Sequence, residues 1–208
     1  MVASPPTDRR RERHVAKRST IVDEAWKLAR RDGLAAISLR DLAAQVDLRQ
    51  PSLYAYFDSK LALYDAMFAD GNRELLAVAT ALPERNDPIE ALVELVEAII
   101  RFSTEDPVRH ELLFHRPVPG FEPSPDSYAL ALAFYELARD RLLAAGASDP
   151  DDLDLFTAIV AGLSDQQVAN DPGGDRWVRL SRRAMQMYLA DIDRHPKSNE
   201  TLSRKANP

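Results

Sequence analysis

The sequence contains no cysteine, only seven glycines and two tryptophans among 208 residues, and no long apolar run. Without cysteine the chain forms no disulfide and carries no thiol chemistry. No stretch approaches the roughly 20 consecutive apolar residues of a membrane-spanning helix. A composition of 45% hydrophobic and 29% charged residues is typical of a soluble globular protein. We therefore expect a cytoplasmic protein that does not bind membranes.

Catalytic and metal-binding motifs are missing as well. The sequence has no P-loop, no dinucleotide fingerprint GxGxxG and no nucleophile elbow GxSxG. His110 and His115 are separated by about 500° around a helix, so they do not share a face as two metal ligands would. These observations predict no catalytic residues, no metal site and no cofactor, and a protein that is not an enzyme.

The net charge of −6 argues at first against nucleic-acid binding, but the charge is unevenly distributed. Residues 1–60 hold 12 Lys and Arg against 8 Asp and Glu, whereas the remainder holds 15 against 25. Residues 1–8 read as a disordered lead, and a basic cluster follows it: Arg9, Arg10, Arg11, Arg13, Lys17 and Arg18. This cluster is either a solvated arm or a set of phosphate contacts. A basic head on an acidic body favours a DNA-binding domain joined to one that does not bind DNA.

Residues 38–60, SLRDLAAQVDLRQPSLYAYFDSK, predict two short helices joined by a tight turn. Ser38 is a good N-cap, and Pro51 suits the first position of the second helix. One apolar face of the first helix is formed by Leu39, Leu42, Ala43 and Val46. Two helices joined in this way form a helix-turn-helix.

The second helix, expected from Pro51 to Phe57, has an unusual surface. Leu53 and Phe57 lie four residues apart and can both be buried against the first helix. The opposite side then carries Pro51, Ser52 and Ala55, with Tyr54 and Tyr56 on its flanks. Small side chains allow close approach to a DNA major groove, and hydroxyls reach phosphates.

These residues resemble the DNA-binding signature of the tetracycline-repressor (TetR) family. The matching positions are Ser38, Leu42, Ala43, Val46, Leu48, Leu53, Tyr54, Phe57, Ser59, Lys60 and Leu63. Asp47 departs from the pattern, because the family has a glycine in this turn, but aspartate tolerates left-handed geometry. The resemblance implies that Lys60 contacts phosphate. The DNA-binding residues that we predict are Arg18, Ser38, Arg40, Arg49, Gln50, Pro51, Ser52, Tyr54, Ala55, Tyr56 and Lys60.

The rest of the chain is also helical in pattern, so the fold class is all-α. We predict a helix-turn-helix domain over residues 1–60, a helical regulatory and dimerisation domain over 61–194, and a disordered tail over 195–208. The helix beginning near residue 59 links the two domains in proteins of the TetR family. In that family, the tilt of this helix sets the position of the DNA-binding domain.

The last two helices, about residues 151–170 and 175–193, are apolar on two sides, and both sides need to be buried. A large monomeric core is one solution. A four-helix interface between two subunits is the other, and it is the arrangement that the resemblance implies. The interface residues that we predict are Leu155, Ala158, Gly162, Val178, Met185 and Leu189.

A ligand pocket is predicted where helices beginning near residues 59, 89 and 126 converge. Its candidate lining is Met67, Phe102, His110, Phe114, Tyr128, Tyr135 and Gln166. Aromatic residues at helical spacing fit a plain core equally well. If the pocket exists, an apolar or aromatic guest suits it better than a highly charged one.

Together these features predict a homodimeric transcriptional regulator that binds a palindromic operator on double-stranded DNA. By resemblance, it is a repressor that a small-molecule effector releases. The rival is a helical small-molecule-binding protein or enzyme whose helix-turn-helix is only structural. The basic head and the missing catalytic set favour the regulator.

Overall fold

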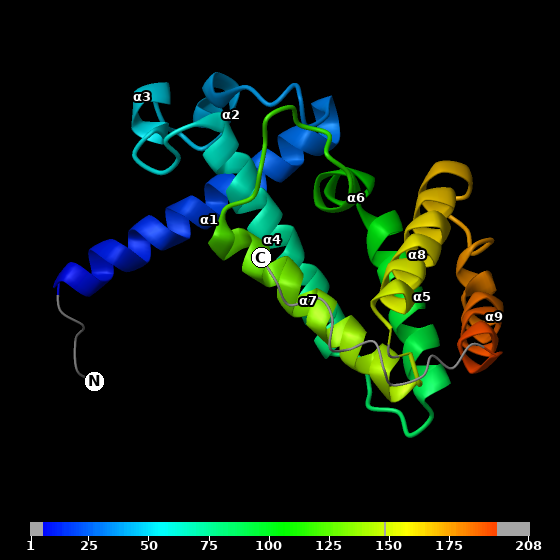
Figure 1. Cartoon of the computed structure of the whole chain (residues 1–208). Coiled ribbons are helices and arrows are strands. Elements are labelled where there is room, and N and C mark those ends of the chain that lie inside the picture. The colour runs from blue at the N-terminus through cyan, green and yellow to red at the C-terminus, as the bar shows by residue number, and fades with distance from the viewer. Residues whose placement is uncertain (1–5, 148, 195–208) are drawn as a thin grey trace. The chain divides into compact units, whose positions relative to one another are not determined.

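The computed structural model describes residues 6–147 and 149–194, and every regular element in this part of the chain is helical (Figure 1). The elements are α1 (Pro6–Asp32), α2 (Leu39–Gln45), α3 (Gln50–Leu53), α4 (Lys60–Thr80), α5 (Pro88–Glu105), α6 (Pro107–Phe114), α7 (Pro125–Ala144), α8 (Pro150–Asn170), the 3-10 turn η1 (Val178–Leu180) and α9 (Ser181–Arg194). The predicted all-α class is confirmed. The predicted lead is too long, because α1 already begins at Pro6; residues 1–5 and the predicted tail lie outside the described residues.

The chain divides into two compact units. Unit 1 comprises Met1–Leu76 and Asp106–Ala133, and unit 2 comprises Ala77–Glu105 and Phe134–Pro208. The boundary expected at residue 60 falls inside unit 1, because Leu63, Tyr64 and Met67 of α4 belong to the same buried core as α1 and α2. None of the described helices is long and apolar enough to cross a membrane.

The core of unit 1 forms where the apolar face of α1 packs against α2 and α4. Ile21, Ala25 and Ala29 are fully buried there, as their spacing predicts. Gly33 ends α1 with a φ of +86°, a left-handed conformation that glycine adopts without strain. Tyr64 donates a hydrogen bond of 2.5 Å to the carbonyl of Leu34, and burial raises the pKa of its phenol.

Helix α6 and the proline-rich segment after it, residues 115–124, also belong to unit 1. The buried Asp106 caps α6 by accepting the N–H of Arg109 at 3.1 Å, and it accepts two hydrogen bonds from the guanidinium of Arg30 on α1, at 2.9 and 2.7 Å. The carboxylate of Asp65 on α4 accepts from the N–H and hydroxyl of Ser124 at 2.7 and 2.9 Å. Phe121 packs against the rings of α4. The segment is therefore fastened to the helix that follows the helix-turn-helix.

Unit 2 is built around α5, α8 and α9. The inner faces of these helices supply the buried cluster that includes Leu92, Val96, Phe156, Met185 and Leu189. A capping box at Asp149 starts α8, with a hydrogen bond between the side chain of Asp152 and the N–H of Asp149 at 3.0 Å. Arg182 at the start of α9 binds Glu90 on α5 through both guanidinium nitrogens. This side-chain hydrogen bond lowers the pKa of Glu90.

Candidate nucleic-acid interface

The helix-turn-helix forms as its sequence dictates. The hydroxyl of Ser38 caps α2 by accepting the N–H of Asp41 at 3.3 Å. The chain then turns at Asp47, which has a φ of +55° and is the sole non-glycine residue with positive φ in the described part of the chain. The left-handed geometry inferred from the sequence at this position is confirmed.

The second helix is shorter than predicted. Regular α-helix covers only Gln50–Leu53. Arg49, the residue before this helix, has an extended backbone with a ψ of 146°. After Leu53 the chain continues as hydrogen-bonded turns. Phe57 donates to the carbonyl of Leu53 at 3.1 Å, and Tyr56 donates to it at 2.9 Å. The surface from Gln50 to Phe57 is thus one helical turn with a tightly wound extension.

This short segment separates buried from exposed side chains cleanly. Leu53 and Phe57 are 1% and 2% exposed and anchor it in the core of unit 1. Tyr54 is 45% exposed, and the other side chains open to solvent are Arg49, Gln50, Pro51, Ser52 and Ala55. Tyr56 is only half-exposed. A rigid surface of small residues beside a tyrosine hydroxyl is available to a DNA groove.

Three residues of α1 hold the helix-turn-helix in place. His14 stacks on Tyr56 with ring centroids 4.7 Å apart, and its Nε2 lies 3.4 Å from the carbonyl oxygen of Ala55. Lys17 donates to the carbonyl of Val46 at the end of α2, at 2.6 Å. The guanidinium of Arg18 lies 4.8 Å from the ring centre of Phe57. We call these contacts the α1 brace.

The α1 brace is absent from the sequence-based prediction, which placed Lys17 and Arg18 among charges facing solvent or phosphate. A signal for it exists in the spacing. Residues 14, 17 and 18 follow the i, i+3, i+4 pattern one turn before the apolar face of α1 begins at Ile21. Long basic side chains can therefore continue a core face beyond its apolar part.

The remaining predicted DNA contacts are accessible. Arg40 and Arg49 are exposed. Lys60 is half-exposed; its ammonium donates to the carbonyl of Ala35 at 2.8 Å and lies 5.6 Å from the ring centre of Tyr64. An ammonium has three donors, so this bond leaves Lys60 able to reach a phosphate. Its role in DNA binding remains a prediction.

Replacement of Asp47 by valine is expected to lower the free energy of unfolding by about 1–2 kcal/mol, because a β-branched residue clashes in left-handed geometry. Asp47→Gly should stay within about 0.5 kcal/mol of wild type, since glycine adopts this φ freely but gains entropy when unfolded. Urea unfolding of the two variants measures the difference. Equal stability of Asp47→Val and wild type would contradict the observed turn.

The helix-turn-helix and much of the chain around it are similar in sequence to known regulators. Residues 21–67, from the core face of α1 to the first half of α4, match the family model described as bacterial regulatory proteins, tetR family. The HTH-type transcriptional repressor KstR of Rhodococcus jostii (strain RHA1) is 26% identical over 154 residues, which cover 74% of this chain and 70% of KstR. The helix-turn-helix is thus similar to that of TetR-family regulators.

Solved structures of TetR-family proteins extend the likeness beyond the helix-turn-helix. PfmR from Thermus thermophilus is 25% identical with a TM-score of 0.60, covering 82% of this chain and 97% of PfmR. A TetR variant from Acinetobacter baumannii AYE, solved in complex with minocycline, is 22% identical with a TM-score of 0.59, covering 86% and 98%. The chain therefore follows a known fold, with an N-terminal helix-turn-helix and a helical C-terminal part.

The predicted pocket residues differ in their surroundings. Met67 and Phe102 are 0% and 3% exposed. Met67 packs in the core of unit 1, and the buried Phe102 of α5 does not face an open surface either; their role in ligand binding remains a prediction. Phe114, Tyr128 and Tyr135 are 43%, 49% and 41% exposed, which excludes the plain-core alternative for them.

The polar members of the predicted pocket also separate. His110 is buried in unit 1, with its ring centroid 5.2 Å from that of Phe114. Gln166 is exposed on α8 and accepts a hydrogen bond from Asn170 at 2.9 Å. The role of either residue in ligand binding remains a prediction.

The predicted interface residues fall into two groups. Leu155, Ala158 and Gly162 of α8 are exposed and form an outer stripe. Val178, Met185 and Leu189 are 3%, 0% and 7% exposed and face the core of their own unit. These three side chains pack into the core of their own unit, so their assignment to an outer interface is corrected; Tyr188 of the other apolar stripe is buried in the same core. The exposed side of α9 carries Met187 instead, 65% exposed.

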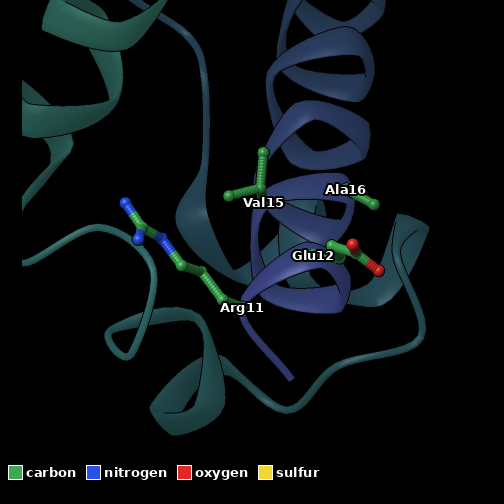
Figure 2. A pocket seen from close by; sticks show the side chains of 4 residues that line it. All are labelled: Arg11, Glu12, Val15 and Ala16. Atoms are coloured by element: carbon green, nitrogen blue, oxygen red, sulfur yellow. The ribbon is translucent and has the colours of Figure 1, made fainter. Parts of the chain in front are cut away.

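An open hollow of about 420 Å³ lies beside α1 and is lined by Arg11, Glu12, Val15 and Ala16 (Figure 2). All four residues come from one solvent-exposed stretch of a single helix. Such a surface does not enclose an apolar guest, and none of the predicted pocket residues contributes to it.

Proposed function

We propose that the chain is a ligand-responsive transcriptional regulator, a repressor that binds a palindromic operator as a homodimer in the cytoplasm. The observation that carries this proposal is the exposed surface from Arg49 to Ala55, held by buried Leu53 and Phe57 and supported by the α1 brace. A rigid element of this size fits a DNA major groove, and a dimer reads half-sites about one DNA turn apart.

Release by a small molecule is the second part of the proposal. The related fold that holds minocycline supports it, as do the exposed Phe114, Tyr128 and Tyr135, which are available to an apolar or aromatic guest. An effector lowers operator affinity only as far as it prefers the conformation that does not bind DNA. The outer stripe of α8, formed by Leu155, Ala158 and Gly162, supplies the dimer contact.

A matched pair of tyrosine variants tests the DNA-binding part. Tyr54→Phe is expected to weaken binding about tenfold or more to a duplex selected from a random-sequence library, because a hydrogen bond to a charged phosphate is lost. Tyr128→Phe removes the same hydroxyl from an equally exposed residue of α7 and should leave affinity unchanged. Both changes keep the ring, so the fold is preserved. Equal affinities of all three proteins would exclude a hydrogen bond from the Tyr54 hydroxyl to DNA.

The rival function, a small-molecule-binding protein or enzyme with a structural helix-turn-helix, predicts no sequence-selective DNA binding at any salt concentration. Regulators of the TetR family are generally DNA-binding proteins without enzymatic activity. The α1 brace also favours the regulator, since it stabilises a surface that nothing in unit 1 covers.

A further inference from the structure

The first turns of α1 form a basic surface that the rest of the described chain leaves unpaired. From Arg9 to Thr20 no side chain is buried, so this stretch continues α1 beyond the core of unit 1 (Figure 1). A helix of this kind gains little from packing, and isolated helices are marginal in water. Glu12 is the one acidic residue between Arg9 and Arg18.

Among the described residues, four arginines of this stretch are clustered and have no carboxylate partner, whereas seven arginines elsewhere have one. Carboxylate partners within ion-pair distance are found for Arg30, Arg31, Arg73, Arg85, Arg109, Arg139 and Arg182. Within the described residues, Arg9, Arg10, Arg11 and Arg13 form no ion pair, and the guanidinium of Arg13 donates only to the carbonyl of Arg9, at 3.1 Å. Unpaired, clustered guanidinium groups are suited to phosphate.

The orientation of these arginines follows from the helix period of about 100° per residue. Arg11 lies on the same face of α1 as His14 and Arg18. These two residues contact Tyr56 and Phe57, which follow α3. Arg10 lies about two helical turns before Lys17 and therefore on the same face of α1. Lys17 contacts the end of α2. Arg9 and Arg13 each lie about 160° around the helix axis from Arg11, although Arg13 is only about 60° from Arg10. Arg11 and Glu12 leave α1 on different sides (Figure 2).

We infer that Arg10 and Arg11 bind phosphates of duplex DNA that flanks the half-site read by α3. This inference rests on the proposed function. Arg10 and Arg11 precede His14 by four and three residues, about 5 Å along the helix axis, and α1 extends further to Pro6. One base pair spans about 3.4 Å, so this extension reaches about one to two base pairs past the segment that α1 contacts. The contacts are independent of base sequence and lengthen the operator footprint.

The test uses the operator duplex selected from a random library, prepared either to end at each half-site or with about 10 base pairs beyond it, roughly one helical turn of extra DNA. The wild-type protein should bind the long duplex at least about tenfold more tightly at low salt. Arg10→Ala/Arg11→Ala should bind both duplexes equally. Two lost contacts in each of two subunits should reduce the slope of log affinity against log salt by about 4.

The matched control is Arg9→Ala/Arg13→Ala, which removes the same charge from the side of the helix that faces away from Arg11. It should keep the preference for the long duplex. Alanine favours helix, so neither double variant disrupts α1, and circular dichroism checks this. Equal wild-type affinity for both duplexes, or equal loss of the preference in both double variants, would overturn the inference while the proposed function stands. Absence of binding to any duplex would overturn both.

Discussion

Gly162→Glu is expected to turn the dimer into a monomer and to lower affinity for a palindromic operator at least about a hundredfold. A charge at a desolvated interface is costly when it has no partner, and a monomer loses the advantage of two linked half-site contacts. Gly162 lies in the outer stripe of α8 and is exposed, and a Cβ atom built there meets nothing within 4 Å. The substitution therefore fits the isolated chain without strain.

The openness of Gly162 makes this variant a clean test of the interface. Glutamate has a higher helix propensity than glycine by roughly 0.5–1 kcal/mol, so the monomer should be no less stable. Gly173→Glu provides the matched control, because a Cβ at Gly173 also meets nothing within 4 Å and lies outside α8. Sedimentation should show monomers for the first variant and dimers for the second. A Gly162→Glu protein that remains dimeric at micromolar concentration would move the interface elsewhere.

Gln167→Leu is expected to lower the free energy of unfolding of unit 2 by about 3–5 kcal/mol. Gln167 is fully buried, and its amide joins the end of α8 to the turn before α9. Its Oε1 accepts the N–H groups of Trp177 and Val178 at 2.7 and 3.2 Å, and its Nε2 donates to the carbonyls of Asp171 and, at 3.3 Å, Gly174. Leucine has a similar volume but removes these partners, and each backbone group that stays out of contact with water, such as the N–H of the buried Val178, then costs about 1–3 kcal/mol.

Thermal unfolding measures this effect, with an expected fall in Tm of about 10 °C for a domain of this size. Gln166→Leu is the control, because Gln166 is exposed on the same helix and bonds only within α8, to Asn170. Its effect should stay within about 0.5 kcal/mol, as for most surface substitutions. A Gln167→Leu protein as stable as Gln166→Leu would show that the amide does not hold the turn.

The helix-turn-helix could be predicted from sequence because its determinants are local. The cap at Ser38, the apolar spacing of α2 and the proline after Gln50 each act over a few residues, and the structure agrees with them. Asp47 is the clearest case: its φ of +55° follows from a turn in which the family has glycine. Short-range rules also misjudged the length of the second helix, since four residues suffice when Leu53 and Phe57 fix it to the core.

Contacts between distant segments could not be predicted in the same way. The ion pair of Arg30 with Asp106 and the bond of Ser124 with Asp65 join residues 76 and 59 positions apart. They place α6 and the proline-rich segment in unit 1, whereas the sequence predicted a boundary at residue 60. Periodicity likewise shows that α9 has two apolar stripes but does not say which one faces inward. Met185, Tyr188 and Leu189 all belong to the core that α9 shares with α5 and α8, so residues of both stripes face inward.

Selection of duplexes from a random-sequence library by the wild-type protein, followed by affinity measurement at two salt concentrations, tests the central claim most directly. A dimer that reads DNA with the α3 surface should enrich a palindrome whose half-sites are centred about one turn, roughly 34 Å, apart. Its affinity should fall steeply with salt despite the net charge of −6, because the basic residues are concentrated near α1 and α3. Recovery of no common sequence, with no binding even at low salt, would contradict the account.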